Sequence, residues 1–558
     1  MFFRKSRPQS GPAAPPLTWR ASGETAAACL SLYWALVVNH PFLSAALHGR
    51  AVNEAATWGF GLSLVVMVAC VHFVLLGLVS HRRTFKPLAA LLAGVAALGT
   101  HFADRYGVYL DPSMIRNVVH TDAHEAAELI GWPLAVSIAA YALPPWLALW
   151  RLRLTRRPGP WARALAWRGA SVAAALVLLV GAALAVFQPL ASLMRQHKEL
   201  RYLITPANAV WSLGRVIATE ARGAAEPRQP IGLDARPGPS WAASPRPRVL
   251  VVVVGETARA ANWGLSGYAR QTTPQLAARG DVINFTQVTS CGTNTEVSVP
   301  CMFAPVGRRD YDEARIRGSD SLLHVLARAG AEVRWRDNQS GCKGVCDGLP
   351  AERVIDLSPP AGLCEDGRCF DEALLHRLDE RIGPARGTHV IVLHEIGNHG
   401  PSYFRRHPRD FARFQPACEQ DDLRLCSREQ IVNAYDNDLL YTDDVLVRLI
   451  RKLAAQADRV DSALLYVSDH GESLGENNLF LHGIPYAIAP DVQKQVPMVM
   501  WFSPGFAPRI GLDTACLAQR AREPAAHDHL FHTVLGLLDV RTALHEPAWD
   551  LTAGCRKP

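Results

Sequence analysis

The chain has 558 residues, of which 49% are apolar and 20% charged, with a formal net charge of +7. This length exceeds a single ordinary core and predicts at least two domains, and the composition excludes a disordered chain. The mean hydropathy of +0.04 lies between the values typical of soluble and of membrane proteins. It therefore suggests that two unlike parts are averaged.

Five stretches without Asp, Glu, Lys or Arg occupy the first 194 residues. They are 25–49, 55–80, 87–103, 129–150 and 169–194. A bilayer core of about 30 Å requires about 20 mostly apolar residues in a helix, and only the third stretch is near the lower limit. Buried helices of a large soluble domain are the alternative, but no such stretch follows residue 194. We therefore expect a transmembrane domain with five helices over residues 1–194.

The charges of the loops predict the orientation in the membrane. The segment before the first stretch is rich in Lys and Arg, as are the connections around residues 81–86 and 151–168. The 104–128 loop is instead acidic. Because positive loops stay on the cytoplasmic side, we expect a cytoplasmic N-terminus and an outer location for everything beyond residue 195. A cleaved signal peptide is not expected, since four more apolar stretches follow the first.

Ten of the twelve cysteines lie beyond residue 290, on the predicted outer side. An even number of clustered cysteines in an oxidising compartment favours disulfides. A zinc site is the alternative, but no CxxC pair is present. Neighbours in sequence suggest the pairs Cys291/Cys301, Cys342/Cys346, Cys364/Cys369, Cys418/Cys426 and Cys516/Cys555.

Residues 195–248 form a connector, in which an amphipathic helical pattern suited to the membrane surface precedes a Pro- and Gly-rich linker. Residues 249–558 contain continuous apolar runs separated by helical patterns, notably 428–455. The expected strands are 249–256, 283–290, 331–336, 388–394, 462–469 and 496–502. This alternation predicts an α/β domain with a largely parallel sheet.

Polar residues gather where the predicted strands end. Glu256 ends the first strand, Asp469 and His470 end another, and His394 and His399 flank the end of a third. Each alone is more often a cap or a salt-bridge partner. Several carboxylate and imidazole groups at one sheet edge, where ligands bind in such folds, suit a zinc ion.

The segment TSCGTNTEVSVPCMF (289–303) places hydroxyl residues at the start of a predicted helix. The helix dipole and free N–H groups favour an oxyanion or a phosphate there, although simple N-capping is the alternative. A hydroxyl bound to zinc would lose its proton readily and become a nucleophile. The spacing alone does not identify which hydroxyl.

Six motifs occur in a fixed order along the outer domain. They are VVVVGETARAANWGLSGYARQTTPQL, TSCGTNTEVSVPCMF, WRDNQSGCKG, GNHGP, NAYDNDLLYTDD and YVSDHGESLGENNLFLHG. Together they closely resemble the lipid A phosphoethanolamine transferases, membrane enzymes of the alkaline phosphatase superfamily that include colistin-resistance proteins. The resemblance covers nearly the whole chain. It implies a five-helix membrane domain (1–194), the connector (195–248) and a periplasmic catalytic domain (249–558) with an alkaline phosphatase/sulfatase-like fold.

The resemblance also implies a set of site residues. Thr295 would be the nucleophile, and the zinc ligands would be Glu256, Thr295, Asp469 and His470. His399 and His482 would bind either a second zinc ion or the substrate phosphate, and Lys343 would help to hold a phosphate. Of the disulfides, Cys291/Cys301, Cys364/Cys369 and Cys418/Cys426 match the family, Cys342/Cys346 matches only some members, and Cys516/Cys555 has the least support.

The 104–130 loop contains Asn117, Thr121 and Glu125, which recur every four residues and would share one helix face. That face could contact the ethanolamine head group, with Glu125 pairing with its ammonium group. A solvated helix face is the alternative. Similar residues occur in the family.

The implied reaction is a ping-pong transfer of phosphoethanolamine from phosphatidylethanolamine to a lipid A phosphate by a monomeric, multi-pass enzyme of the bacterial inner membrane. Its partners would be these lipids and not nucleic acid, for which no motif is present. A relative with another acceptor, such as a core sugar or a periplasmic glucan, or with a glycerol-phosphate donor, stays open. A sulfatase is disfavoured because no CxPxR motif occurs. A transporter is disfavoured by the absence of charges in the membrane stretches, and a membrane sensor would not require the ligand set.

Overall fold

The structure is a computed structural model that describes residues 18–79, 83–121, 123–155, 160–225, 227–242, 245–365, 367–383 and 385–557. The chain divides into two compact units. The first comprises Met1–Asp104 and Trp132–Trp211, and the second comprises Arg105–Gly131 and Ser212–Pro558. The predicted domain boundaries stay predictions; the units differ from them in grouping residues 105–131 with the C-terminal part.

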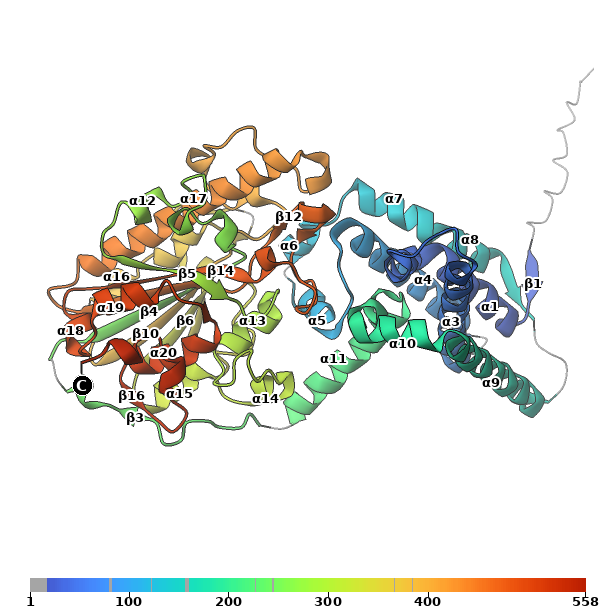
Figure 1. Ribbon diagram of the computed structural model, residues 1–558, viewed down its shortest axis with the longest axis horizontal. Coiled ribbons are helices and arrows are strands. Elements are labelled where there is room, and N and C mark those ends of the chain that lie inside the picture. The colour runs from blue at the N-terminus through green and yellow to red at the C-terminus, as the bar shows by residue number, and fades with distance from the viewer. Residues whose placement is uncertain are drawn as a thin grey trace, which may run out of the picture. The chain divides into compact units, whose positions relative to one another are not determined.

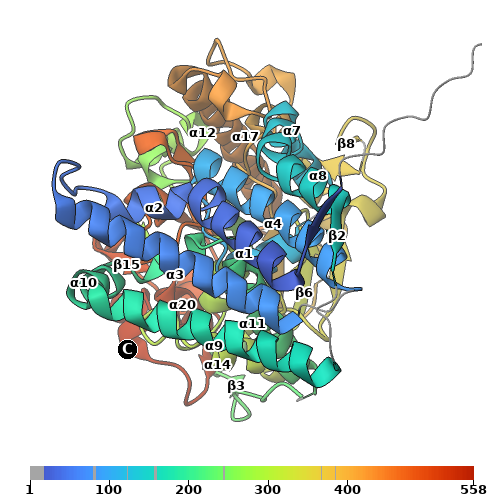
Figure 2. The ribbon, with the colours of Figure 1, turned by 90° about the vertical axis from the view of Figure 1, so that its right-hand side faces the viewer.

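The first unit is built from apolar helices. They are α1 (Gly23–Tyr33), α2 (His40–Leu47), α3 (Ala55–Val79), α4 (Phe85–Tyr106), α7 (Trp132–Tyr141), α8 (Leu143–Arg151), α9 (Trp161–Ala185) and α10 (Phe187–Gln196). Helices α3 and α9 run side by side (Figure 2). By length and composition, three helices of the described chain can each cross a membrane, and five spans result if each of two bent helix pairs counts as one. The five spans correspond to the five uncharged stretches of the sequence.

The two bent spans have proline at the break. The first runs from Gly23 to Val38 and continues as α2 with a bend of 54°, and the second joins α7 to α8 with a bend of 42°. Pro41 lies in the first turn of α2, and α8 also has proline in its first turn. Proline lacks the backbone N–H that would continue the preceding helix, so the axis changes direction there.

The second unit contains an eight-stranded sheet in the order β15-β5-β14-β11-β4-β10-β6-β7. Its strands are β4 (Arg248–Gly255), β5 (Val282–Thr289), β6 (Glu332–Asp337), β7 (Ala351–Arg353), β10 (Thr388–His394), β11 (Asp461–Ser468), β14 (Gln495–Phe502) and β15 (Ala525–Ala526). All eight residues of β4 and all eight of β11 are buried. Continuous apolar runs are expected of strands covered on both faces.

The pairing confirms a largely parallel sheet. Among the described strands of this sheet, only β14 runs antiparallel to its neighbours, β11 and β5. All six strands expected from the sequence are present. The short edge strands β7 and β15 were not expected, because two or three residues carry too little periodicity to be recognised.

Helices cover both faces of this sheet (Figure 1). On one side lie α13 (Thr295–Met302), α15 (Leu322–Arg328), α19 (Thr514–Arg520) and α20 (Asp528–Leu537), whose apolar residues form one buried cluster with Leu250, Val252 and Val254. On the other side lie α12 (Pro274–Ala277) and α17 (Arg428–Ala454). Helix α17 begins with a capping box between Ser427 and Gln430, in agreement with the helix expected over 428–455.

The segment 105–131 packs within the second unit, although it lies between two membrane stretches in sequence. It forms α5 (Pro112–His120) and α6 (Ala123–Glu128). Arg105 pairs with Asp422, and Arg116, whose side chain is 2% exposed, pairs with Glu313. These ion pairs join the segment to the C-terminal part of the chain.

In the described part of the connector, α11 (Ala207–Ala225) is followed by the short strand β3 (Arg236–Pro237) and a 3-10 helix (Pro239–Trp241) before β4 begins. All ten cysteines beyond residue 290 form disulfides. The pairs are Cys291–Cys301, Cys342–Cys346, Cys364–Cys369, Cys418–Cys426 and Cys516–Cys555.

Candidate active site

Four neighbouring parallel strands end at the same edge of the sheet and bring polar residues together. Gly255 of β4 is in register with Ser468 of β11, so Glu256 and Asp469 leave the sheet side by side. On the other side of β4, His394 of β10 aligns with Asp337 of β6. The sheet topology therefore brings Glu256 and Asp469, which are more than 200 positions apart in the sequence, to the same edge.

Helix α13 delivers a hydroxyl group to this edge. Asn294 is its N-cap and accepts a hydrogen bond from the N–H of Val297, so Thr295 is the first helical residue. The hydroxyl of Ser298 donates to the carbonyl oxygen of Asp469, and this bond ties the helix to the strand end. Thr295 thus lies at the positive end of the helix dipole, where an anion is favoured.

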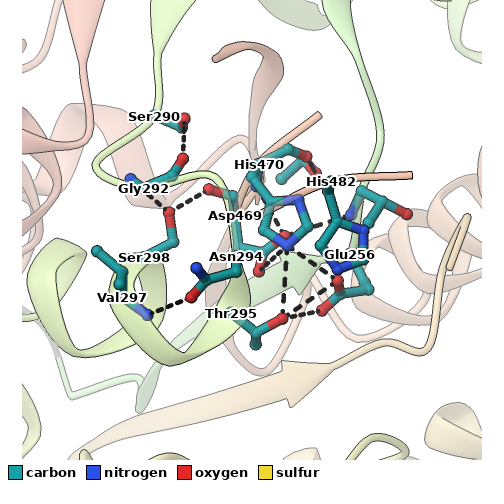
Figure 3. A network of polar contacts seen from close by, with 12 residues as sticks. Glu256, Ser290, Gly292, Asn294, Thr295, Val297, Ser298, Asp469, His470 and His482 are labelled. Atoms are coloured by element: carbon teal, nitrogen blue, oxygen red, sulfur yellow. Dashed lines mark hydrogen bonds and ion pairs between the residues drawn. The ribbon is translucent and has the colours of Figure 1, made fainter. Parts of the chain in front are cut away.

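The hydroxyl group of Thr295 contacts a buried cluster formed by Glu256, Asp469 and His470 (Figure 3). Its Oγ1 lies 3.1 and 3.3 Å from the two carboxylate oxygens of Glu256 and 3.5 Å from Nε2 of His470. His470 Nε2 lies 3.2 Å from Glu256 Oε1 and 3.4 Å from Asp469 Oδ2. The four side chains converge on one point.

The cluster has the donor set and the size of a zinc site. His470 Nδ1 donates to the carbonyl oxygen of Gly471, so neutral His470 turns the lone pair of Nε2 toward the two carboxylates. Asp469 Oδ2 has no hydrogen-bond partner among the described residues. Electron-rich atoms that face one another at these distances are stabilised by a metal cation or a proton between them. A tetrahedron with zinc–ligand bonds of about 2.1 Å has edges of about 3.4 Å, close to the distances above.

Burial disfavours the charged form of all three titratable side chains in the cluster. It raises the pKa of the Glu256 carboxyl, and burial together with the charge of Glu256 raises the pKa of Asp469 to about 6. The neighbouring carboxylates favour the charged form of His470, but burial outweighs them and lowers its pKa. Two carboxylates without a cation are therefore strained in this position, and the residues fit a divalent metal.

His399 and His482 lie beside the cluster. The ring of His482 is 4.4 Å from that of His470 and 5.2 Å from that of His399, between centroids. Burial and the charge of His482 lower the pKa of His399. Burial also opposes the charged form of His482, but the carboxylates of Glu472, Glu256 and Asp469 raise its pKa to about 9. His482 Nδ1 lies 3.5 Å from Glu472 Oε1, whereas His399 Nδ1 has no hydrogen-bond partner in the described chain.

Lys343 is held near Thr295 through Glu296, the residue that follows Thr295 in the chain. Its Nζ lies 3.3 Å from Glu296 Oε1 and 2.6 Å from Ser340 Oγ. Arg317, at 3.2 Å, and His120, at 3.1 Å, bind the same buried carboxylate. The sequence singled out Lys343 but not Glu296, whose partners come from three separate segments and leave no local signal.

The sequence did not predict two further contacts at this edge of the sheet. Gln339 Nε2 donates to Glu256 Oε2 at 3.3 Å, and Asp337 Oδ1 lies 2.8 Å from His394 Nδ1. Gln339 belongs to the motif WRDNQSGCKG, which follows β6. The position of that motif at a strand end was the available signal.

The residues expected to contact the head group do not share one continuous helix. Asn117 lies in α5, and Thr121 is the C-cap of α5, where its hydroxyl donates to the carbonyl oxygen of Asn117. The chain then starts a second helix, α6. The side chain of Glu125 lies outside the described residues.

The comparisons with known proteins agree over both parts of the chain. The family model described as "Sulfatase" matches residues 248–540, and that described as "Phosphoethanolamine transferase EptA/EptB" matches residues 68–221. Phosphoethanolamine transferase EptA of Salmonella typhimurium is 38% identical over 94% of this chain and 96% of its own length. Phosphatidylethanolamine transferase Mcr-1 of Escherichia coli is 36% identical over 86% of this chain and 89% of its own.

A solved structure matches the whole fold. The integral membrane protein lipooligosaccharide phosphoethanolamine transferase A (EptA) from Neisseria meningitidis superposes with a TM-score of 0.90 at 37% identity, covering 97% of this chain and 100% of that chain. Its soluble domain alone, at 46% identity and a TM-score of 0.57, covers 60% of this chain and 99% of that chain. With this agreement in sequence and in fold, the chain belongs to the phosphoethanolamine transferase family of the alkaline phosphatase superfamily.

Proposed function

We propose that this protein transfers phosphoethanolamine from phosphatidylethanolamine to a phosphate group of lipid A through a covalent phosphoethanolamine–Thr295 intermediate. The observation that carries the proposal is the position of Thr295 Oγ1, 3.1 Å from Glu256 and 3.5 Å from His470, inside a buried cluster at a helix N-terminus. The relatives named as phosphoethanolamine and phosphatidylethanolamine transferases support the donor. A more distant one, 28% identical, is named for a lipid A acceptor.

Glu256, Asp469, His470 and Thr295 would hold zinc. When bound, zinc would lower the pKa of the threonine hydroxyl and neutralise charge on the phosphoryl oxygens. Glu256, as the acceptor of the Thr295 hydroxyl hydrogen bond, is placed to take its proton. His399, His482 and Lys343 would hold the phosphoryl oxygens, and Asn117 and Thr121 would contact the head group.

In the first half-reaction, Thr295 Oγ1 forms a bond to phosphorus while the bond from phosphorus to the glycerol oxygen breaks. Diacylglycerol leaves with a proton. In the second half-reaction, a phosphate oxygen of the acceptor forms a bond to phosphorus, the bond from phosphorus to Oγ1 breaks, and Oγ1 takes up the proton that the acceptor phosphate releases. Positioning and charge neutralisation supply most of the catalysis in such phosphoryl transfers.

The variant Thr295→Ala tests the proposal, with Thr295→Ser as the matched control that keeps a hydroxyl. Mass spectrometry of lipid A from cells that express each form should show phosphoethanolamine addition with wild type, reduced addition with Thr295→Ser and none with Thr295→Ala. Modified lipid A at the wild-type level in Thr295→Ala would refute the assigned nucleophile. Modification of a core sugar or a glucan instead would identify another acceptor.

Metal analysis of the purified protein tests the ligand set. We expect bound zinc in wild type and its loss in Asp469→Asn, where the amide replaces a charged ligand. Glu523→Gln, an exposed acid outside the site, should retain zinc. A wild-type protein without zinc would favour a sensor over an enzyme. We also propose that the N-terminus is cytoplasmic, the catalytic part periplasmic, and the protein monomeric.

A further inference from the structure

A cavity of about 630 Å³ lies next to the catalytic cluster in the second unit. Five arginines line it, against two carboxylates, those of Asp337 and Glu365. The arginines are Arg353, Arg368, Arg405, Arg406 and Arg409. Such a concentration of guanidinium groups in a concave surface is suited to bind phosphate, whose oxygens accept paired hydrogen bonds from the guanidinium fork.

Not all of this charge is neutralised by the protein. Arg406 and Arg368 share the buried carboxylate of Glu128, at 2.7 and 3.0 Å, and Arg405 pairs with Asp421 at 3.3 Å. Arg353 and Arg409 are exposed, and neither forms an ion pair with any acid that the structure describes. These two cations are available to a ligand.

The cavity shares a wall with the catalytic centre. Gln339 lines the cavity and donates to Glu256 Oε2 at 3.3 Å. Arg406 also lines it, and its Nε donates to the carbonyl oxygen of His399 at 2.8 Å. A molecule that reacts at Thr295 can therefore extend into the cavity without a long spacer.

A buried imidazole adds an uncharged contact. His407 lines the cavity and is 6% exposed. Its Nδ1 donates to the carbonyl oxygen of Pro408, and its Nε2 has no hydrogen-bond partner among the described residues. Burial lowers the pKa of His407, so this ring adds a polar surface without a positive charge to the wall of the cavity.

We infer that this arginine-lined cavity binds a second phosphate of the acceptor, at a distance from the phosphate that reacts. The inference rests on the proposed function. The donor carries one phosphate, which must lie at Thr295, and its ammonium group would be repelled by the arginines. An acceptor glycolipid with two phosphates supplies the additional anion that the arginines of the cavity can bind.

The test compares two acceptors with the full-length enzyme in micelles that contain phosphatidylethanolamine. One acceptor is bis-phosphorylated lipid A, and the other is the same lipid with one phosphate. Wild type should have a KM about tenfold lower for the bis-phosphorylated acceptor, since one charge-assisted contact typically contributes about that factor. In Arg353→Gln/Arg409→Gln, the KM for the bis-phosphorylated acceptor should rise about tenfold and remove this preference.

Arg541→Gln is the matched control, because Arg541 is exposed and lies in the short strand β16 (Val540–Arg541), away from the cavity; it should keep the preference. If the double variant unfolds at a lower temperature than wild type, Arg409→Gln alone replaces it, with a smaller rise expected. An unchanged preference, or an equal rise for both acceptors, would overturn the inference. Absence of transfer to either acceptor by wild type would instead refute the proposed function.

Discussion

The carboxylate of Glu296 is fully buried and is contacted by three basic side chains, Lys343, Arg317 and His120, from separate parts of the second unit. Burial opposes its charge, but Lys343, Arg317 and His120 lower its pKa below the ordinary carboxyl value. A carboxylate held in this way stabilises the fold above the unfolded pKa, and the contribution is lost as the pH falls through the lowered folded pKa.

We therefore expect Glu296→Gln to lower the free energy of unfolding by roughly 3 kcal/mol at pH 7, because it leaves Lys343 buried without its partner. Thermal unfolding measured from pH 7 down to pH 3 should show that this deficit is constant above the ordinary carboxyl pKa and shrinks below it. Glu546→Gln is the control: Glu546 also pairs with an arginine, Arg309, but its side chain is half exposed, so its loss should cost less than about 1 kcal/mol. Equal effects of the two changes would contradict the special role of Glu296.

Site residues that directly follow a strand could be predicted from the sequence. Site residues that are brought together by long-range packing could not. Glu256, Asp469 and His470 come directly after apolar runs, and parallel strands necessarily bring their carboxyl ends to one edge. Glu296 and Gln339 depend on partners from other segments, and neither periodicity nor composition indicates which segments will meet. The four-residue spacing of Asn117, Thr121 and Glu125 did not show that α5 ends at His120 and a second helix, α6, follows; their contact with the head group stays a prediction.

At the scale of elements, the loop after β10 depends on a glycine. Gly397 has a φ of +45°, and a Cβ added there would lie 2.6 Å from the carbonyl oxygen of Glu256 and 3.0 Å from its nitrogen. The loop therefore approaches the backbone of a proposed metal ligand more closely than any side chain would allow.

Gly397→Ala should displace Glu256 and reduce transfer at least tenfold, with a loss of bound zinc. Gly387→Ala, before the same strand, is the control. Its φ is +75° but no atom lies within 4 Å of the added Cβ, so it has the cost of the backbone conformation without the clash. Transfer assays and zinc analysis of the two variants distinguish the effect of the clash from that of the backbone conformation. Equal losses would show that backbone strain alone is responsible.

The disulfide with the least support from sequence closes the longest loop. Cys516 and Cys555 are 39 residues apart, whereas Cys342 and Cys346 are separated by four. Since a disulfide stabilises mainly by restricting the unfolded chain, the longer loop contributes more, about 4 kcal/mol against about 2 kcal/mol.

We expect the paired change Cys516→Ser/Cys555→Ser to lower the unfolding temperature more than Cys342→Ser/Cys346→Ser. Thermal unfolding of the two double variants under oxidising conditions measures this difference. The reverse order would show that local strain or residual structure dominates over loop length. Sequence distance made the 516/555 pair hard to predict, since only the folded chain brings α19 next to the C-terminal residues.

For the whole molecule, the two-part organisation could be predicted because membrane spans and an α/β sheet follow different hydrophobic patterns. The proposed orientation follows from the Arg-rich loops. A fluorescent protein fused to the N-terminus should fluoresce, and a reporter phosphatase fused to the C-terminus should be active. The opposite pattern would invert the topology and separate the enzyme from the compartment in which its disulfides form.

The membership of residues 105–131 in the second unit has a consequence for fragments of this protein. A soluble fragment that begins after the connector contains every proposed metal ligand but omits this segment. Arg406 is 4% exposed and would lose Glu128, and Glu296 would lose His120. Such a fragment would therefore keep its fold and its metal ligands but would have an incomplete substrate pocket. Inhibitors selected against the fragment would then encounter a different surface in the whole enzyme.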